Sequence, residues 1–160
     1  MSAAAGAAAL TLAATPVLAQ TSNAHFIASH TRASLSGMDL TVKFKEAGLE
    51  SGSEITVQLS ADLDATYQCL NNGGKNPNDP KKTDIDTTVS ANVPFTVPKN
   101  GQLSGTITLQ APAASTVLSC PPGQTATLTA VAWSNIELTD LTTGAYLFVP
   151  GVFSAGAVVN

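Results

Sequence analysis

Apolar and polar residues alternate along this chain with a period of two, which is typical of strands that bury one face. In the longest run every second side chain from Ile55 to Cys69 is apolar. The pattern points Cys69 inward, and because so long a strand is unusual it also predicts a bend near Asp62–Asp64. Further strands are expected at residues 25–35, 38–45, 85–97, 103–109, 125–139 and 145–153.

Short segments rich in Gly, Asn and Ser separate these runs. Asn100-Gly101 predicts a type I′ hairpin between 85–97 and 103–109, because both central residues of that turn need a positive φ. Ser36-Gly37 and Thr143-Gly144 indicate further turns, and Lys45–Leu49 is a candidate helical turn. About seven strands at this spacing predict an all-β, immunoglobulin-like antiparallel sandwich that forms one domain over 20–160.

Trp133, the sole tryptophan, interrupts the alternation of 125–139. The even positions Leu128, Ile136 and Leu138 form the apolar face, whereas Trp133 falls on the odd face. Either a β-bulge flips the register near Trp133 and buries it, or the indole lies outside, against a ligand or a covering loop.

The N-terminal segment has the composition of a signal peptide. Residues 2–18 carry no charge, and small side chains at Val17 and Ala19 fit a cleavage site, so residues 1–19 are expected to be removed. Cleavage after Ala24 is the alternative, and an N-terminal anchor helix is the other interpretation. The mature protein is therefore expected to be secreted and extracellular, with no membrane association after cleavage.

The two cysteines of an exported chain predict one disulfide, Cys69–Cys120. It would close a loop of about 50 residues, worth about 4 kcal/mol in the chain-entropy model. Two free thiols are the alternative; two metal ligands are another, but a pair of thiolates without a nearby His makes a poor zinc site.

Charge argues against two classes of partner. The chain has 7 Lys and Arg against 11 Asp and Glu, and the sequence shows no basic run beyond Lys81-Lys82. Nucleic acids and anionic membranes both need a positive patch, so neither is expected to bind.

Paired aspartates are the first candidates for chemistry. Asp62 and Asp64 share one face of a strand, and Asp84 and Asp86 repeat the spacing, which suits Ca²⁺ binding or acid–base catalysis. Asp62 and Asp64 belong to the polar set of the best alternating strand, which favours ordinary solvated residues. The Asn71–Thr83 loop offers carbonyls near Asp84 but lacks the acidic density of calcium loops, so no cofactor is expected.

Two histidines allow a copper hypothesis. Cleavage after Ala24 would place a free amine beside the His25 imidazole, half of a copper brace. His30 lies five residues on, which puts it on the opposite face of an unbroken strand. The sequence contains no Gly-x-Ser-x-Gly motif of the kind that positions a nucleophilic serine. The chain is therefore predicted not to be an enzyme.

Several stretches resemble one family. They are Val42-x-Phe44-Lys45-Glu46-Ala47-Gly48-Leu49, Cys69-x-Asn71-x-Gly73-Gly74-x-x-Pro77, Cys120-Pro121-Pro122-Gly123 and Asn135-Ile136-x-Leu138-Thr139-Asp140. In this order they are similar to a group of small exported proteins of actinobacteria and filamentous fungi. The resemblance implies a disulfide between the two cysteines, a β-sandwich and export, and it implies no activity.

These observations favour a non-enzymatic extracellular binding or structural module. Its expected contact surface is the loop end that holds Asn71, Asn72, Lys75, Asn78, Asp79 and Gln124, and its expected partner is an extracellular molecule or a cell-wall component. A metal-dependent (copper or calcium) protein or enzyme and a host- or competitor-directed factor are the alternatives. Lys43 and Lys45 would protect 38–45 as an edge strand, which favours a monomer.

Overall fold

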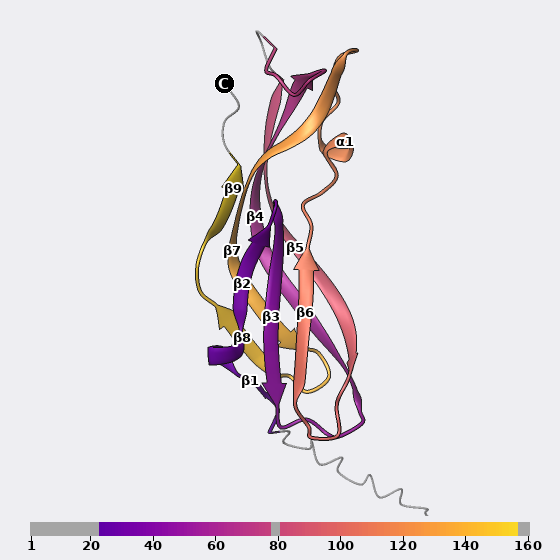
Figure 1. The fold of residues 1–160 in the computed structure, drawn as a ribbon, viewed down its shortest axis with the longest axis vertical. Coiled ribbons are helices and arrows are strands. Elements are labelled where there is room, and N and C mark those ends of the chain that lie inside the picture. Colours follow the sequence, from indigo (N-terminus) through magenta and orange to yellow (C-terminus); the bar gives the residue numbers. More distant parts are fainter. Residues whose placement is uncertain (1–22, 78–80, 157–160) are drawn as a thin grey trace, which may run out of the picture.

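Two antiparallel β-sheets face each other in this protein (Figure 1). The computed structural model describes residues 23–77 and 81–156, and most of them lie in strands. The predicted all-β sandwich with one disulfide is therefore confirmed. The immunoglobulin-like strand layout stays a prediction.

The smaller of the two sheets is built around β3 (Asp39–Ala47). β6 (Leu103–Leu109) pairs with one edge of β3. β2 (Arg32–Ser36) and the two-residue β1 (His25–Phe26) pair with the other edge, one after the other. We call these four strands the small sheet.

The larger sheet, called the long sheet below, has β4 (Glu54–Asn71) and β7 (Gln124–Asp140) at its centre. β5 (Lys82–Thr96) pairs with the free edge of β4. β8 (Tyr146–Val149) and β9 (Phe153–Gly156) pair with successive stretches of the outer edge of β7.

Three strand predictions are wrong in detail. The run 25–35 is split by a short 3-10 helix, η1 (Ala28–His30), into β1 and β2. The run 145–153 is split into β8 and β9 where Pro150-Gly151 intervenes, because proline lacks the amide that a ladder needs. The run 38–45 is not an edge strand, because β3 has neighbours on both sides. The expectation of a monomer therefore loses the support that it took from an edge strand at this position.

Two turn predictions are also wrong. Lys45–Leu49 forms no helical turn, since β3 continues to Ala47. Asn100-Gly101 does not close a hairpin, because β5 and β6 belong to different sheets. A turn in which the Gly101 amide donates to the Pro98 carbonyl at 3.0 Å carries the chain across, and only Gly101 of the pair has a positive φ (69°).

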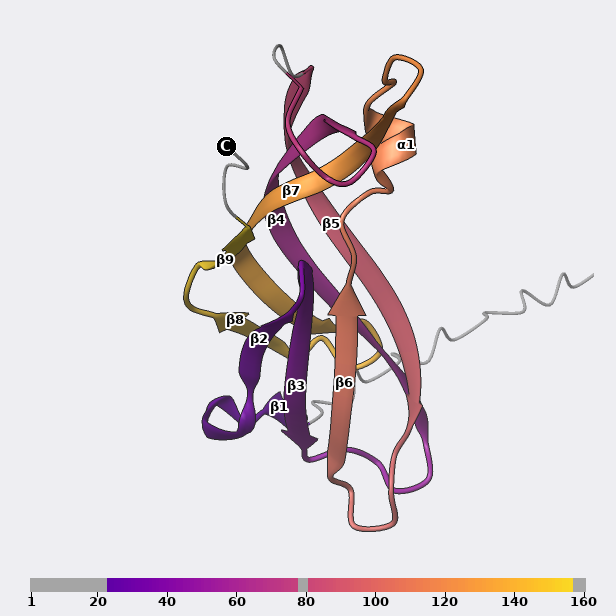
Figure 2. The ribbon, with the colours of Figure 1, turned by 45° about the horizontal axis from the view of Figure 1, so that its top comes forward.

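The central strands of the long sheet extend beyond the small sheet at one end (Figure 2). There the inner face is covered by the connection from β6 to β7, which contains the short helix α1 (Ala114–Val117). Leu118 after the helix is buried, and the Tyr67 hydroxyl donates to the Pro112 carbonyl at 2.7 Å. This connection lets the core continue to the tip of the long strands.

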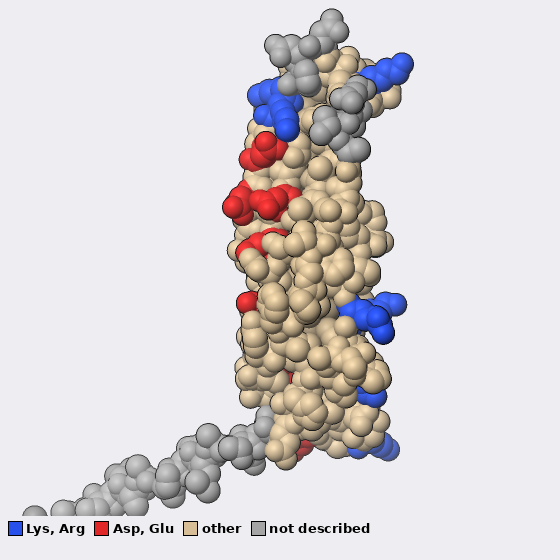
Figure 3. Space-filling view, turned by 90° about the vertical axis from the view of Figure 1, so that its left-hand side faces the viewer, with Lys and Arg blue, Asp and Glu red and all other residues tan. Residues whose placement is uncertain are grey.

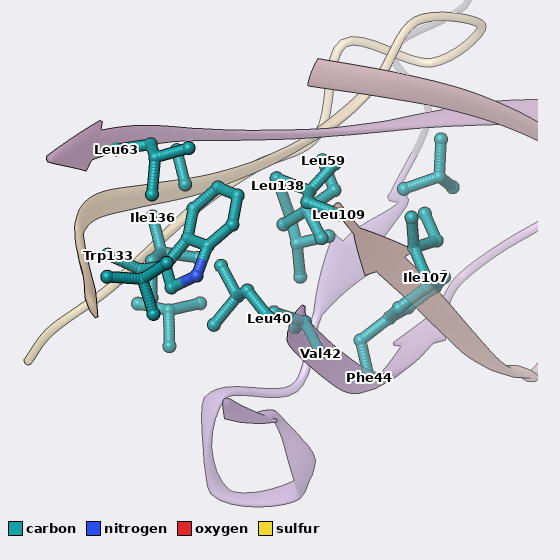
Figure 4. Close-up of a cluster of buried hydrophobic side chains, with 14 of the residues drawn as sticks. Leu40, Val42, Phe44, Leu59, Leu63, Ile107, Leu109, Trp133, Ile136 and Leu138 are labelled. Carbon is teal, nitrogen blue, oxygen red and sulfur yellow. The ribbon is translucent and has the colours of Figure 1, made fainter. Parts of the chain in front are cut away.

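Trp133 is fully buried in the core, where it lies beside Leu63 and Ile136 (Figure 4). The register of β4 against β7 shifts so that Ser60 faces Glu137 whereas Asp62 faces Ser134, which places an extra residue in β7. Asn135 lies at this bulge and adopts a positive φ of 47°. The predicted bulge is confirmed: it brings Trp133 inward, and the indole N–H donates to the Met38 carbonyl at 3.0 Å.

Candidate functional site

The disulfide joins two segments at the overhanging end of the long sheet. Cys69, near the end of β4, bonds to Cys120 in the connection before β7, and their Cα atoms lie 5.6 Å apart. Cys69 is fully buried, as the alternation from Ile55 predicts. The Cys69–Cys120 prediction is confirmed, and the loops on either side of the bridge are held side by side. We call this region, residues 71–77 with 118–124, the stapled end.

The first loop of the stapled end folds back on β4. The backbone N–H of Asn71 donates to the Lys75 carbonyl at 2.8 Å, and the N–H of Gly74 donates to the backbone carbonyl of Asn71 at 2.9 Å. Gly73 and Gly74 both have positive φ, 98° and 75°, which suits glycine in a tight turn. Asn71, Asn72 and Lys75 face solvent. These hydrogen bonds therefore hold the backbone of the loop, while the side chains of Asn71, Asn72 and Lys75 stay exposed.

The second loop meets the first. Gln124 is the first residue of β7 and lies directly opposite Asn71. Its backbone N–H donates to the Pro121 carbonyl at 3.1 Å. The Lys81 ammonium donates to the Ser119 carbonyl at 2.8 Å and so ties the start of β5 to this loop. The structure thus brings together Asn71, Asn72, Lys75 and Gln124, while Asn78 and Asp79 of the same prediction lie outside the described residues.

The paired aspartates lie together on the outer face of the long sheet. Asp64 is directly opposite Asp86, and Asp84 faces Thr66. Together with Ala130 and Ala132 of β7 they line a shallow hollow of about 410 Å³. In Figure 3 acidic side chains gather along one border of the molecule. Sequence alternation predicts the outward direction of these side chains, but the cross-strand pairing is needed to place the two pairs side by side.

Local hydrogen bonds account for two of these carboxylates. Asp62 accepts from Asn135 Nδ2 and from Thr88 Oγ1, both at 2.8 Å, and these bonds lower its pKa. Asp84 accepts from Thr66 Oγ1 at 2.6 Å and lies 3.8 Å from the Lys82 ammonium. Across residues 23–77 and 81–156, no group of three or more His, Cys, Asp or Glu side chains is arranged to hold a metal ion.

The two histidines do not share one strand. His25 lies in β1, where its Nδ1 is 2.8 Å from the Asn23 carbonyl oxygen. His30 ends η1, and its Nδ1 is 3.1 Å from Ser29 Oγ. His25 and His30 therefore do not occupy opposite faces of one strand, as the sequence predicted, because η1 breaks the strand between them. The copper hypothesis gains no further ligand among the described residues.

Sequence reasoning missed a pair of buried carboxyl groups between the sheets. Glu46 of β3 and Asp140 at the end of β7 are both fully buried. Burial, and then the neighbouring Asp140 charge, raise the pKa of Glu46 to about 8. Strand parity contained the signal: Glu46 continues the inward set Val42 and Phe44, and Asp140 continues the inward set of Ile136 and Leu138.

Asp140 organises the turn between β7 and β8. Its Oδ1 accepts from the amides of Thr142 and Thr143 at 2.7 and 3.2 Å, and its Oδ2 accepts from Thr143 Oγ1 at 2.6 Å. The predicted turn at Thr143-Gly144 is confirmed, with the Gly144 amide donating to the Asp140 carbonyl at 2.8 Å. Asp140 therefore fixes this turn through its own hydrogen bonds, while its charge contributes to the raised pKa of Glu46.

Comparison with known proteins adds no relative. No protein-family model matches the chain, and neither the curated proteins nor the solved structures contain a match. Neither helix in the described part of the chain is long and apolar enough to cross a membrane.

Proposed function

We propose that this chain is an exported, non-enzymatic binding or structural module that contacts an extracellular partner through its stapled end. The fold in this proposal is an immunoglobulin-like sandwich, and the family is the group of small exported proteins that the sequence resembles. The disulfide and the lack of a membrane-crossing helix among the described residues are compatible with an extracellular location.

One observation supports the proposal most directly: covalent and hydrogen bonds hold the backbone of the stapled end while Asn71, Asn72 and Lys75 expose their side chains. A disulfide, a β-bridge from Asn71 to Lys75, and the bond from Lys81 to Ser119 fix two neighbouring loops. Binding residues concentrate on loops that a rigid scaffold positions. Ordering these loops in advance lowers the entropy lost when a partner binds.

A binding screen tests this proposal. The mature protein is presented to immobilised polysaccharides and cell-wall fractions, and retained protein is measured for wild type and for Asn72→Ala combined with Lys75→Ala. Lys99→Ala combined with Gln102→Ala is the matched control, because it removes one lysine and one amide from exposed positions in the turn between β5 and β6 at the opposite end.

We expect the stapled-end variant to lose retention and the control to keep it. Equal retention by wild type and the stapled-end variant would reject this surface. Mass spectrometry of the exported protein tests the location, and a mature start at His25 would reopen the copper alternative. Retention on host or competitor cells in place of wall fractions would favour the host- or competitor-directed factor.

A further inference from the structure

Cations gather on the outer face of the small sheet. Lys43 and Lys45 project outward from β3, because Val42, Phe44 and Glu46 between and beside them are buried. Arg32 of β2 lies directly opposite Lys43. On the other edge, Thr106 and Ser104 of β6 lie opposite Lys43 and Lys45. We call Arg32, Lys43, Lys45 and the two hydroxyl residues the basic face.

The basic face contains a hollow. It measures about 290 Å³ and is lined by His30 from η1, the two lysines and the β6 hydroxyls, together with Phe44 and Gly105. The Phe44 ring lies against Gly105, where a Cβ would be only 2.5 Å from Phe44 Cζ. The side-chain groups at this hollow that can bond a ligand are two ammonium groups, an imidazole and two hydroxyls, and all of them can act as donors.

No carboxylate neutralises these cations within the described part of the chain. There the one salt bridge joins Lys82 to Asp84, on the long sheet. Asp39 shares the face with Lys43 but lies four residues along β3, about 13 Å away, where Gln110 donates to it at 3.4 Å. Like charges directly opposite on neighbouring strands destabilise a sheet, and Arg32 opposite Lys43 is such a pair. A bound anion would relieve this repulsion.

The basic face stands out against the overall negative charge of the molecule. The chain has a net charge of −4 and only 7 basic residues, yet three of them lie on this face. Figure 3 shows some basic side chains on the border opposite the acidic one and others beyond the end of the acidic row on its own border. The sequence contains no basic run here, because β2 and β3 bring Arg32 and Lys43 together only on pairing. A count of basic runs therefore misses this face, and the expectation that nucleic acids and anionic membranes do not bind stays a prediction.

We propose that the basic face binds the anionic groups of an acidic polysaccharide. Lys43 and Lys45 are separated by about 7 Å along the strand, which matches a linear polymer with repeated charges better than a single small anion. The hydroxyls of Ser104 and Thr106 lie beside the two lysines, on the neighbouring strand β6, and can bond sugar hydroxyls. Nucleic acid fits less well, since single strands need exposed aromatic stacking platforms and Phe44 on this strand is buried. The site goes beyond the proposed function, because it lies on the small sheet, away from the stapled end.

Binding to dextran sulfate and to polygalacturonate, with neutral dextran as the reference polymer, tests the proposal. Affinities are measured at about 50 mM salt, where exposed charges are only partly screened. Lys43→Gln combined with Lys45→Gln is compared with Lys82→Gln combined with Lys99→Gln. Both variants have the same net charge, and the control removes its charges from other surfaces. Thermal unfolding confirms that each variant folds.

We expect wild type to bind at least one acidic polymer and not neutral dextran, and the basic-face variant to bind roughly tenfold more weakly. The control should change affinity by less than about twofold, and Lys43→Arg with Lys45→Arg should keep binding. Equal weakening of both glutamine variants would show that overall charge alone attracts the polymer. That result, a failure of wild type to bind either acidic polymer, or tighter binding of a thymidine oligonucleotide would overturn the proposal. The Asn72→Ala, Lys75→Ala variant should bind acidic polymer normally even if the stapled-end proposal fails.

Discussion

Replacing Glu46 by glutamine should change how the stability of this protein depends on pH. Neither carboxyl oxygen of Glu46 accepts a hydrogen bond within the described residues, and the side chain is fully buried. Desolvation and the nearby Asp140 charge raise its pKa from 4.5 to about 8. At neutral pH the folded protein therefore keeps Glu46 protonated, able to donate to Asp140, whereas the unfolded chain ionises it.

The magnitude follows from proton linkage. Between pH 4.5 and pH 8, the two pKa values of Glu46 in the unfolded and folded states, the folded state holds one more proton than the unfolded state. Stability then falls by about 1.4 kcal/mol for each pH unit. This contribution is fully present below the lower value and is lost as pH rises through the higher one. Between pH of about 5 and about 8 the loss amounts to about 3 to 4 kcal/mol.

Urea unfolding across this pH range provides the assay. Glutamine cannot titrate and its amide can donate to Asp140, so Glu46→Gln should be about as stable as wild type near pH of about 5 and about 3 kcal/mol more stable near pH of about 8. Glu50→Gln is the control, because Glu50 is exposed, and its curve should run parallel to that of wild type. Parallel curves for Glu46→Gln and wild type would refute the reasoning, since Glu46 would then titrate alike in both states.

Three further changes test the packing. Trp133→Phe should lower the free energy of unfolding by about 2 to 3 kcal/mol in urea titrations, because it removes side-chain volume from the core and the hydrogen bond of the indole. An unchanged urea midpoint would contradict the burial of this side chain in the core. Reducing Cys69–Cys120 should cost about 4 kcal/mol for a separation of 51 residues, seen as a lower urea midpoint in dithiothreitol. Gly105→Ala should cost about 1 to 3 kcal/mol, because the new Cβ meets the Phe44 ring; calorimetry showing no loss would mean that the ring moves freely.

The sequence predicts β4 and its buried side chains well, and the reason is local. One face of this strand lines the core along its whole length, so the alternation from Ile55 to Cys69 predicts which side chains are buried; Gln68 is the exception, because it is buried although it belongs to the polar set. The disulfide follows from the same alternation together with the cysteine count. The exposed backbone turns at Gly37 and Gly144 are also local, since glycine there supplies a positive φ.

Non-local choices escape such reasoning. Asn100-Gly101 has the chemistry of a hairpin turn, but the same residues also suit a turn that leads from one sheet to the other. Only the packing of the whole core decides which strand β6 joins. Trp133 is an intermediate case: its wrong parity predicts a bulge, while the residue that absorbs it, Asn135, is known only from the pairing with β4.

Charge clusters are the least predictable feature, and the two proposed surfaces depend on them or on loop contacts. Arg32 and Lys43 are far enough apart in the sequence to escape any count of basic runs, and antiparallel pairing of β2 with β3 places them opposite each other. Pairing of β4 with β5 does the same for Asp64 and Asp86. Because opposite charges thus collect on the outer faces of different sheets, removing charge from the basic face leaves both the acidic face and the stapled end unaltered. The two proposed surfaces can therefore fail or succeed independently.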